Sequence, residues 1–164
     1  TLELVNLITI NESEALMLRW ILELNDLELS DALATHVGGA WILGDVRSRL
    51  DRVREWVNSP QKHQRQFGVM SLMPLAKLRN FGDVSLALST LTGAMREEDV
   101  EVRKSVARVI REMSVRGPNE TAIFLATWSD TIDKNTDWIV RHSVEKLDLD
   151  TRNNIVGALR GRTK

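Results

Sequence analysis

Cysteine is absent from the 164-residue sequence, which excludes a disulfide framework, a thiolate nucleophile and a cysteine-ligated zinc site. No apolar run approaches the roughly 18 residues of a membrane span, and the opening TLELVNLITI lacks the basic segment of a secretory signal. There is no P-loop, dinucleotide fingerprint or Ser-His-Asp order, and His36, His63 and His142 show no metal-ligand spacing. We therefore expect a soluble, cytoplasmic protein that needs neither a metal nor an organic cofactor.

Charge is unevenly distributed along the chain, although the net charge is only −1. Residues 1–60 hold five Arg and ten acidic residues, whereas residues 61–164 hold 17 Lys or Arg and 13 acidic residues. Such an asymmetry between halves points to a basic working surface in the C-terminal part.

Apolar residues recur at spacings of three and four along almost the whole chain, which indicates an all-α protein. We predict about nine helices, over residues 13–24, 30–43, 45–57, 60–78, 83–95, 99–114, 118–129, 137–147 and 150–160. Start signals support several of these boundaries, namely the N-cap candidates Ser30, Asp45, Asp99 and Asp137 and the first-turn prolines Pro60 and Pro118.

Three tryptophans and a pair of glycines are expected to serve in helix packing. Trp20 and Trp41 lie within apolar stripes and are expected in the core, while Trp56 is expected between helices. The Gly pair in THVGGA lies inside an apolar helix, so we expect it to permit close helix packing.

A short segment repeats along the chain. DVEVRKSV at residues 99–106 and DWIVRHSV at residues 137–144 share five columns, and Arg103 and Arg141 are 38 residues apart. Another step of 38 residues back reaches Arg65. Periods in this range are typical of solenoids built from helix pairs. The repeat resembles HEAT repeats, and we predict one HEAT-like domain over residues 1–164, a curved stack of about four helix pairs.

The repeated Arg has two interpretations. In the first, each Arg bridges to an acid or a carbonyl of the next repeat and holds the register of the stack. In the second, the Arg column faces a groove and follows a phosphodiester backbone, because a guanidinium engages phosphate oxygens in pairs. A basic stripe along the same helices would widen such a groove; its members are Lys104, Arg108, Arg111 and His142.

Longer segments carry a more specific resemblance. VRKSVARVIREMSVRGPNETAIFLATW followed by DWIVRHSVEKL resembles the DNA alkylation repair proteins of the AlkC and AlkD kind, which are HEAT-like alkylpurine DNA glycosylases. The similarity is best over residues 99–147 and weaker over residues 26–98. It implies a DNA glycosylase, a hydrolase of N-glycosidic bonds, with alkylated double-stranded DNA as its partner.

The resemblance assigns roles to individual residues. SDALATHVGG followed by HQRQFGVM is similar to the family's order of a catalytic Asp and a later Arg, which makes Asp31 the carboxylate and Arg65 a backbone contact. Arg111 falls where the family has a further DNA-contacting Arg. The family pattern has Trp where this sequence has Leu27 and Arg108, and it has more helices ahead of the Asp. From its position after Ser30, Asp31 could equally be a carboxylate favoured at a helix start.

Three functions therefore stay open at this point. The first is a glycosylase that releases purines alkylated at N3 or N7, with Asp31 as the carboxylate and with DNA contacts from Arg65, Arg103, Lys104, Arg108, Arg111, Arg141 and His142. The second is a DNA-binding relative without catalysis, because the two Trp residues are missing. The third is a HEAT-repeat scaffold for a protein partner. In each case we expect a monomer that does not bind a membrane.

Overall fold

The computed structural model describes the backbone of residues 2–160 and the side chains of residue 12 and residues 14–159. This part of the chain is helical and contains no strand, as predicted. The helices are α1 (Leu2–Glu23), α2 (Leu27–Leu33), α3 (Gly39–Gly44), α4 (Val46–Val57), α5 (Lys62–Met70), α6 (Met73–Lys77), α7 (Val84–Ser89), α8 (Val100–Met113), α9 (Pro118–Trp128), α10 (Lys134–Ser143) and α11 (Leu149–Arg160). A π-helical segment (Ala34–Gly38) joins α2 to α3, and 3-10 segments follow α7 and α10.

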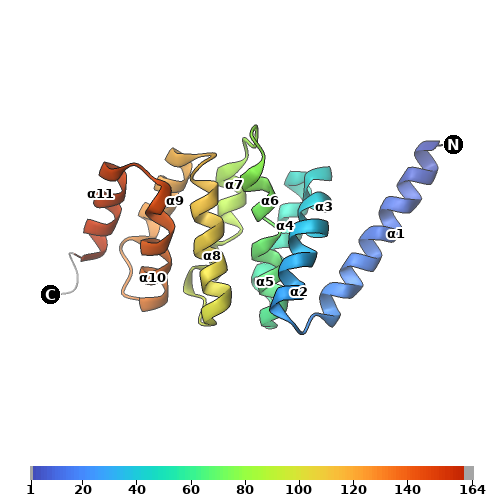
Figure 1. Ribbon diagram of the computed structural model, residues 1–164, viewed down its shortest axis with the longest axis horizontal. Coiled ribbons are helices and arrows are strands. Elements are labelled where there is room, and N and C mark those ends of the chain that lie inside the picture. Colours follow the sequence, from blue (N-terminus) through green and yellow to red (C-terminus); the bar gives the residue numbers. More distant parts are fainter. Residues whose placement is uncertain (1, 161–164) are drawn as a thin grey trace.

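The helices form a stack of antiparallel pairs with two rows (Figure 1). One row runs through α2, α5, α8 and α10, each in contact with the next, and the other contains α4, α7, α9 and α11. This is the HEAT-like solenoid expected from the 38-residue period, in which each pair buries its apolar face against its neighbours. We call α2, α5, α8 and α10 the first row, because every predicted site residue lies on it.

Several predicted boundaries are confirmed by the cap contacts. The Asp45 carboxylate accepts a hydrogen bond from the Ser48 amide at 3.4 Å and begins α4. The Asp99 carboxylate accepts from the amides of Glu101 and Val102 at 3.0 and 3.2 Å and begins α8. Pro118 occupies the first turn of α9, where its missing N–H costs no helical hydrogen bond.

Two predicted N-caps are wrong. Helix α2 begins earlier than Ser30, because the Asp26 carboxylate accepts from the Leu29 amide at 2.8 Å; Ser30 is buried inside the helix. Helix α10 begins earlier than Asp137, because Asp133 accepts from the Thr136 amide at 2.8 Å. In both cases an Asp four residues upstream binds the free amides first.

The predicted helix over 60–78 is also wrong as a single element. Its first helix, α5, begins at Lys62 and ends at Met70, and a new helix begins at Met73. Pro74 explains the break, because a proline inside a continuous helix would lack an amide donor and clash with the carbonyl four residues back.

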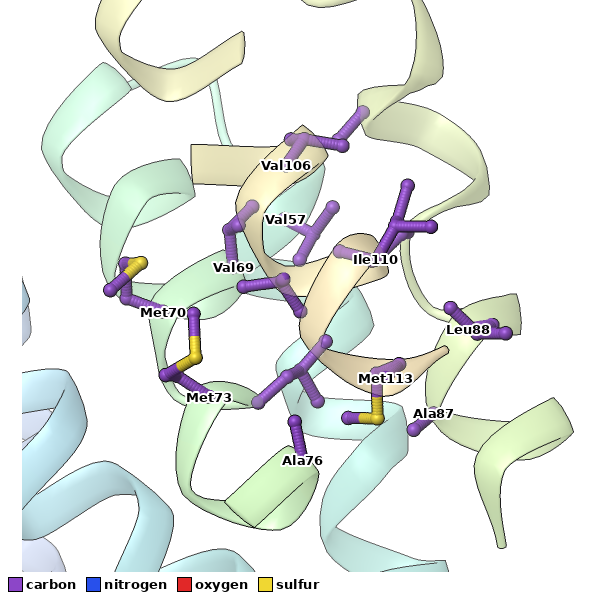
Figure 2. Packing of buried hydrophobic residues seen from close by; sticks show 14 of the residues in the cluster. Val57, Val69, Met70, Met73, Ala76, Ala87, Leu88, Val106, Ile110 and Met113 are labelled. Carbon is purple, nitrogen blue, oxygen red and sulfur yellow. The ribbon is translucent and has the colours of Figure 1, made fainter. Parts of the chain in front are cut away.

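The core forms where α8 packs between neighbouring helices. Figure 2 shows Val106, Ile110 and Met113 of α8 facing Val69, Met70, Met73 and Ala76 on one side and Ala87 and Leu88 on the other. One face of α8 is inaccessible to solvent, as the spacing of its apolar residues predicts; it consists of Val102, Val106, Val109, Ile110 and Met113. Burial of this face fixes which side chains of α8 are left for the surface.

Close packing at the Gly pair is confirmed. A Cβ on Gly38 would lie 2.9 Å from the Phe67 ring, and one on Gly39 would clash with the Pro74 ring. The core prediction for Trp20 is wrong, because α1 lies at the end of the stack and leaves Trp20 42% exposed. Trp41 is half-buried, and Trp56 is buried with its ring centroid 5.4 Å from that of Trp41.

The contact between α4 and α5 yields a stability test at Gly68. A Cβ there would lie 2.8 Å from the Val57 amide nitrogen, which belongs to the backbone and has little room to move. We expect Gly68→Ala to lower the free energy of unfolding by about 1–3 kcal/mol in equilibrium urea unfolding. The matched control is Gly157→Ala on α11, where a Cβ meets nothing within 4 Å and a gain of about 0.5–1 kcal/mol is expected. Equal stability of both variants would contradict this packing.

Candidate functional site

Asp31 lies inside α2, in its second turn, on the first row. Because Asp26 caps this helix, Asp31 does not serve as its N-cap. The Asp31 side chain is half-buried, which is unusual for a carboxylate without a salt bridge. A π-helical segment begins three residues later, and such segments are frequent at functional sites.

A buried amide contacts this carboxylate. Gln66 of α5 donates from Nε2 to Asp31 Oδ1, and the same Nε2 donates to Ser105 Oγ of α8 at 2.8 Å. Only 3% of Gln66 is exposed. Its carbonyl oxygen Oε1 is buried and has no partner among the described residues. Three neighbouring helices of the first row thus meet at one amide.

The surroundings shift the protonation equilibrium of Asp31. Burial raises the pKa of the Asp31 carboxyl above its ordinary value, because desolvation disfavours the charged form. The Gln66 hydrogen bond and the positive charge of Arg108 act against this increase. The carboxylate is therefore destabilised by its position and supported by two specific neighbours.

Two open hollows meet at Asp31. The first, which we call the Asp31 hollow, has a volume of about 310 Å³ and is lined by Leu27, Glu28, Asp31, Gln66, Glu101, Lys104, Ser105 and Arg108. The second, the His36 hollow, has about 520 Å³, and its lining includes Asp31, Thr35, His36, Met70, Lys77 and Arg108. Asp31 and Arg108 belong to both. A ligand in either hollow would contact a carboxylate and a guanidinium of opposite charge.

The Asp31 hollow brings together three positions that the sequence resemblance singled out. Leu27, Asp31 and Arg108 line the same space, although Arg108 is 77 residues from Asp31 in sequence. Arg108 is exposed and makes no hydrogen bond or salt bridge with any described residue, although its positive charge acts on the Asp31 carboxylate. Its guanidinium remains free for a ligand.

Arg65 is held within the stack. Its Nε and Nη2 donate to the two oxygens of Glu97 at 2.7 and 3.0 Å, and its Nη1 donates to the carbonyls of Ser59 and Pro60, each at 3.1 Å. The side chain of Glu97 is only 4% exposed. This is the inter-repeat bridge of the first interpretation. A role in DNA binding would require Arg65 to give up these contacts.

Arg103 bridges to the next repeat in a different way. Its Nη1 donates to Asn135 Oδ1, and its guanidinium carbon lies 5.2 Å from the centroid of the Trp138 ring. The Trp138 ring also stacks on His142, with centroids 3.8 Å apart. Arg103 and Trp138 line a further open hollow of about 550 Å³ with Glu98, Lys134 and Asn135. His142 is exposed beside it.

The remaining predicted cations are paired with acids. Lys104 pairs with Glu101 at 2.8 Å, Arg111 with Glu145 at 2.6 Å, and Arg141 with Asp137 at 2.7 Å. The Arg111 pair joins α8 to the segment after α10, whereas the other two lie within single helices. The Lys104 pair is exposed and contributes at most about 1 kcal/mol, whereas Arg111 and Arg141 are partly buried in their pairs.

The sequence repeat does not give equal positions in the helices. Arg103 follows the N-cap Asp99 by four residues, whereas Arg141 follows the N-cap Asp133 by eight. The Asp of the second copy, Asp137, therefore lies inside α10 and binds Arg141 instead of capping the helix. Equal spacing in sequence has produced two different local environments.

The family comparison bears directly on these features. The family model described as DNA alkylation repair enzyme matches residues 5–147, which is most of the chain. The chain belongs to the DNA alkylation repair enzyme family. Searches of curated proteins and of solved structures gave no match. The matched range contains the whole first row of this family member, including all three hollows.

Some lining residues of this DNA alkylation repair family member were not predicted from its sequence. Gln66 and Ser105 are the clearest cases, since both are polar residues buried on helices with apolar faces. A polar residue within an apolar stripe was the available signal at both positions.

Among the described residues, no group of three or more His, Cys, Asp or Glu side chains could hold a metal ion. The described helices include none that is long and apolar enough to cross a membrane.

The buried bridge between Arg65 and Glu97 predicts a large stability effect. Glu97→Gln removes the negative charge and leaves the Arg65 guanidinium partly buried without its counterion. We expect the free energy of unfolding to fall by on the order of 3 kcal/mol in urea unfolding. Glu101→Gln is the matched control, because its pair with Lys104 is exposed and should change stability by less than about 1 kcal/mol. A loss for Glu97→Gln as small as for the control would mean that this bridge does not hold the stack.

The raised pKa of Asp31 predicts a stability effect that depends on pH. As pH rises above the unfolded-state pKa of a carboxyl whose folded pKa is raised, the folded state loses stability relative to the unfolded state. We therefore expect Asp31→Asn to be more stable than the parent at neutral pH, with the difference disappearing in acid below both pKa values. Urea unfolding of both proteins across this pH range measures the difference. A variant that is less stable at neutral pH would contradict a destabilised carboxylate.

Proposed function

We propose that this protein binds alkylated duplex DNA along the first row and hydrolyses the N-glycosidic bond of purines alkylated at N3 or N7. The observation that carries this proposal is the half-buried Asp31 carboxylate, which lies in an open hollow beside a free Arg108 guanidinium. Membership of the DNA alkylation repair enzyme family supports DNA as the partner. The bond cleaved and the residue responsible are our assignment.

One carboxylate is sufficient for this chemistry. A purine alkylated at N3 or N7 is positively charged, so it leaves with the electron pair of the C1′–N bond and becomes neutral. The sugar develops positive charge in the transition state, which an ionised Asp31 would stabilise. Water then bonds to C1′ and releases a proton, as in glycoside hydrolysis generally. The reaction needs neither a metal nor an organic cofactor.

The proposed DNA contacts differ in their availability. Arg108 is free, and Lys104 is held only by the exposed Glu101, so both can bind phosphate at the Asp31 hollow with little loss. The same row carries further cations that would exchange partly exposed partners for phosphates, namely Arg103, Arg111, Arg141 and His142. Arg65 would do so only at the cost of a mostly buried bridge. We therefore propose Lys104 and Arg108 as the principal contacts near the lesion.

A second candidate, a DNA-binding relative without catalysis, is favoured by the chemistry of Arg108. The guanidinium lies where the family pattern has a Trp, and it carries the same charge as an alkylated base. It would attract a phosphate and repel a cationic purine. Leu27 likewise provides no aromatic face for the base.

The charge of the hollows argues against a protein scaffold. The Asp31 hollow is lined by two acids and two cations in addition to Asp31, whereas most of the large exposed apolar side chains lie on other elements. Examples are Leu16, Trp20 and Leu22 of α1 and Ile123 of α9. An apolar peptide would find little matching surface on the first row.

The proposal predicts measurable release of alkylated base. Duplex DNA methylated at purine N3 and N7 should lose free base in a single-turnover assay, and Asp31→Asn should lower the rate on the order of 100-fold, because the transition-state charge is no longer stabilised. Asp51→Asn on α4 is the control, since it removes an exposed carboxylate from the other row. Release by Asp31→Asn at the parental rate would overturn the assignment.

Binding measured on the same samples separates the two candidates. Both expect duplex affinity to fall steeply with salt, and both expect Arg108→Ala to reduce the salt slope by about one. Binding without base release from the parent protein would favour the silent relative, in which case Leu27→Trp combined with Arg108→Trp tests whether the aromatic faces alone are missing. Failure to bind duplex DNA would exclude both.

A further inference from the structure

Gln66 occupies an unusual position for an amide side chain. It belongs to α5, yet its contacts are with α2 and α8, through Asp31 and Ser105. It is nearly inaccessible to solvent but lines the Asp31 hollow. It therefore connects the three successive first-row helices that form the hollow.

Packing alone does not explain this residue. Both contacts are made by Nε2, and the carbonyl oxygen Oε1 is left buried with no partner among the described residues. An unsatisfied buried acceptor is unfavourable, and a side chain of similar length without polar atoms, such as Met, would fill the space without it. The benefit of the amide must therefore come from what its N–H group donates to.

The orientation of the amide is determined by its neighbours. With Nε2 toward Asp31, a donor faces a carboxylate; the opposite orientation would place two oxygens against each other. Ser105 Oγ accepts the second bond of Nε2 and so prevents the amide from turning away. The NH₂ group of Gln66 is thus held by two acceptors, one on Asp31 and one on Ser105.

We propose that Gln66 is a positioning residue that, held by Ser105, keeps the Asp31 carboxylate in one orientation in the Asp31 hollow. This role deepens the proposed function and rests on it, since it matters to the extent that Asp31 stabilises the developing charge on the sugar. Gln66 makes no contact with the reacting atoms in this assignment. It acts through Asp31.

The electrostatic consequence follows from the same contact. A hydrogen bond donated to a carboxylate favours the ionised form, so Gln66 lowers the pKa of Asp31 against the increase caused by burial. The other charged or titratable groups lining the two hollows are Glu28 of α2, Glu101, Lys104 and Arg108 of α8, Lys77 of α6 and His36. None of these is altered by a substitution at Gln66, so a change in the titration of Asp31 would report on the amide.

The first test measures the ionisation of Asp31 directly. In the full chain, the carboxyl carbon of Asp31 is titrated by NMR in the parent, in Gln66→Met and in Gln64→Met. We expect the Asp31 midpoint to move to higher pH in Gln66→Met, because the donated hydrogen bond is lost. Gln64 is a matched control, since it is a buried Gln on the same helix that bonds to Ser59 and Gln61 instead. The same midpoint in all three proteins would overturn the proposal.

A second variant covers the case in which Gln66→Met does not fold. Gln66→Asn keeps an amide but is one methylene shorter, so its N–H group falls short of Asp31. The midpoint should again move to higher pH, and an unchanged midpoint would again overturn the proposal. Ser105→Ala should produce a smaller change in the same direction.

The second test links the residue to base release. The rate of release is measured against pH for the parent and for the Gln66 variant that folds. We expect its acid limb to move to higher pH with the Asp31 midpoint, whereas a merely structural residue would lower stability and leave the limb in place. If the parent releases no base, the proposed function fails, while the NMR titration still decides the role of Gln66.

Discussion

The packing of α5 between α2 and α8 is the contact on which the rest of the structure depends. Within the first row, α5 lies between α2 and α8 and packs against both. Its apolar residues enter the core, with Phe67 and Val69 fully buried, and Gly68 allows the backbone of α4 to approach. Because the apolar side of α5 is fixed in this way, Gln66 is brought between Asp31 and Ser105.

The cations of the first row divide into two groups according to burial. Arg65 shares a mostly buried bridge with Glu97 and two carbonyls, so its charge is committed to joining one repeat to the next. Lys104 and Arg108 remain near solvent, where an ion pair is weak and a phosphate can replace it. A solenoid can therefore repeat the same residue type along its length while using only some copies for binding.

Asp31 and Gln66 both occupy positions that are unfavourable for folding. One is a carboxylate whose pKa is raised by burial, and the other leaves a buried oxygen without a partner. Such features are common where a site needs a charged group in a poorly solvated position, and the surrounding core supplies the stability that they lack. Their coincidence in one hollow is the strongest physical argument that this part of the family fold has a chemical role.

The sequence by itself determined the helical class and the stacking of helix pairs, because apolar spacing and a 38-residue period depend only on local order. The family was indicated by the resemblance of longer segments and is shown by the family model. The resemblance also predicted Asp31 as the carboxylate, and the structure places Asp31, Leu27 and Arg108 around one hollow. Only the tertiary structure decided that Asp26 caps α2, that Glu97 binds Arg65 and that Gln66 supports Asp31. The Glu97 and Gln66 contacts depend on how one helix packs against another, and the Asp26 cap depends on where a helix starts. A repeat in the sequence specifies neither.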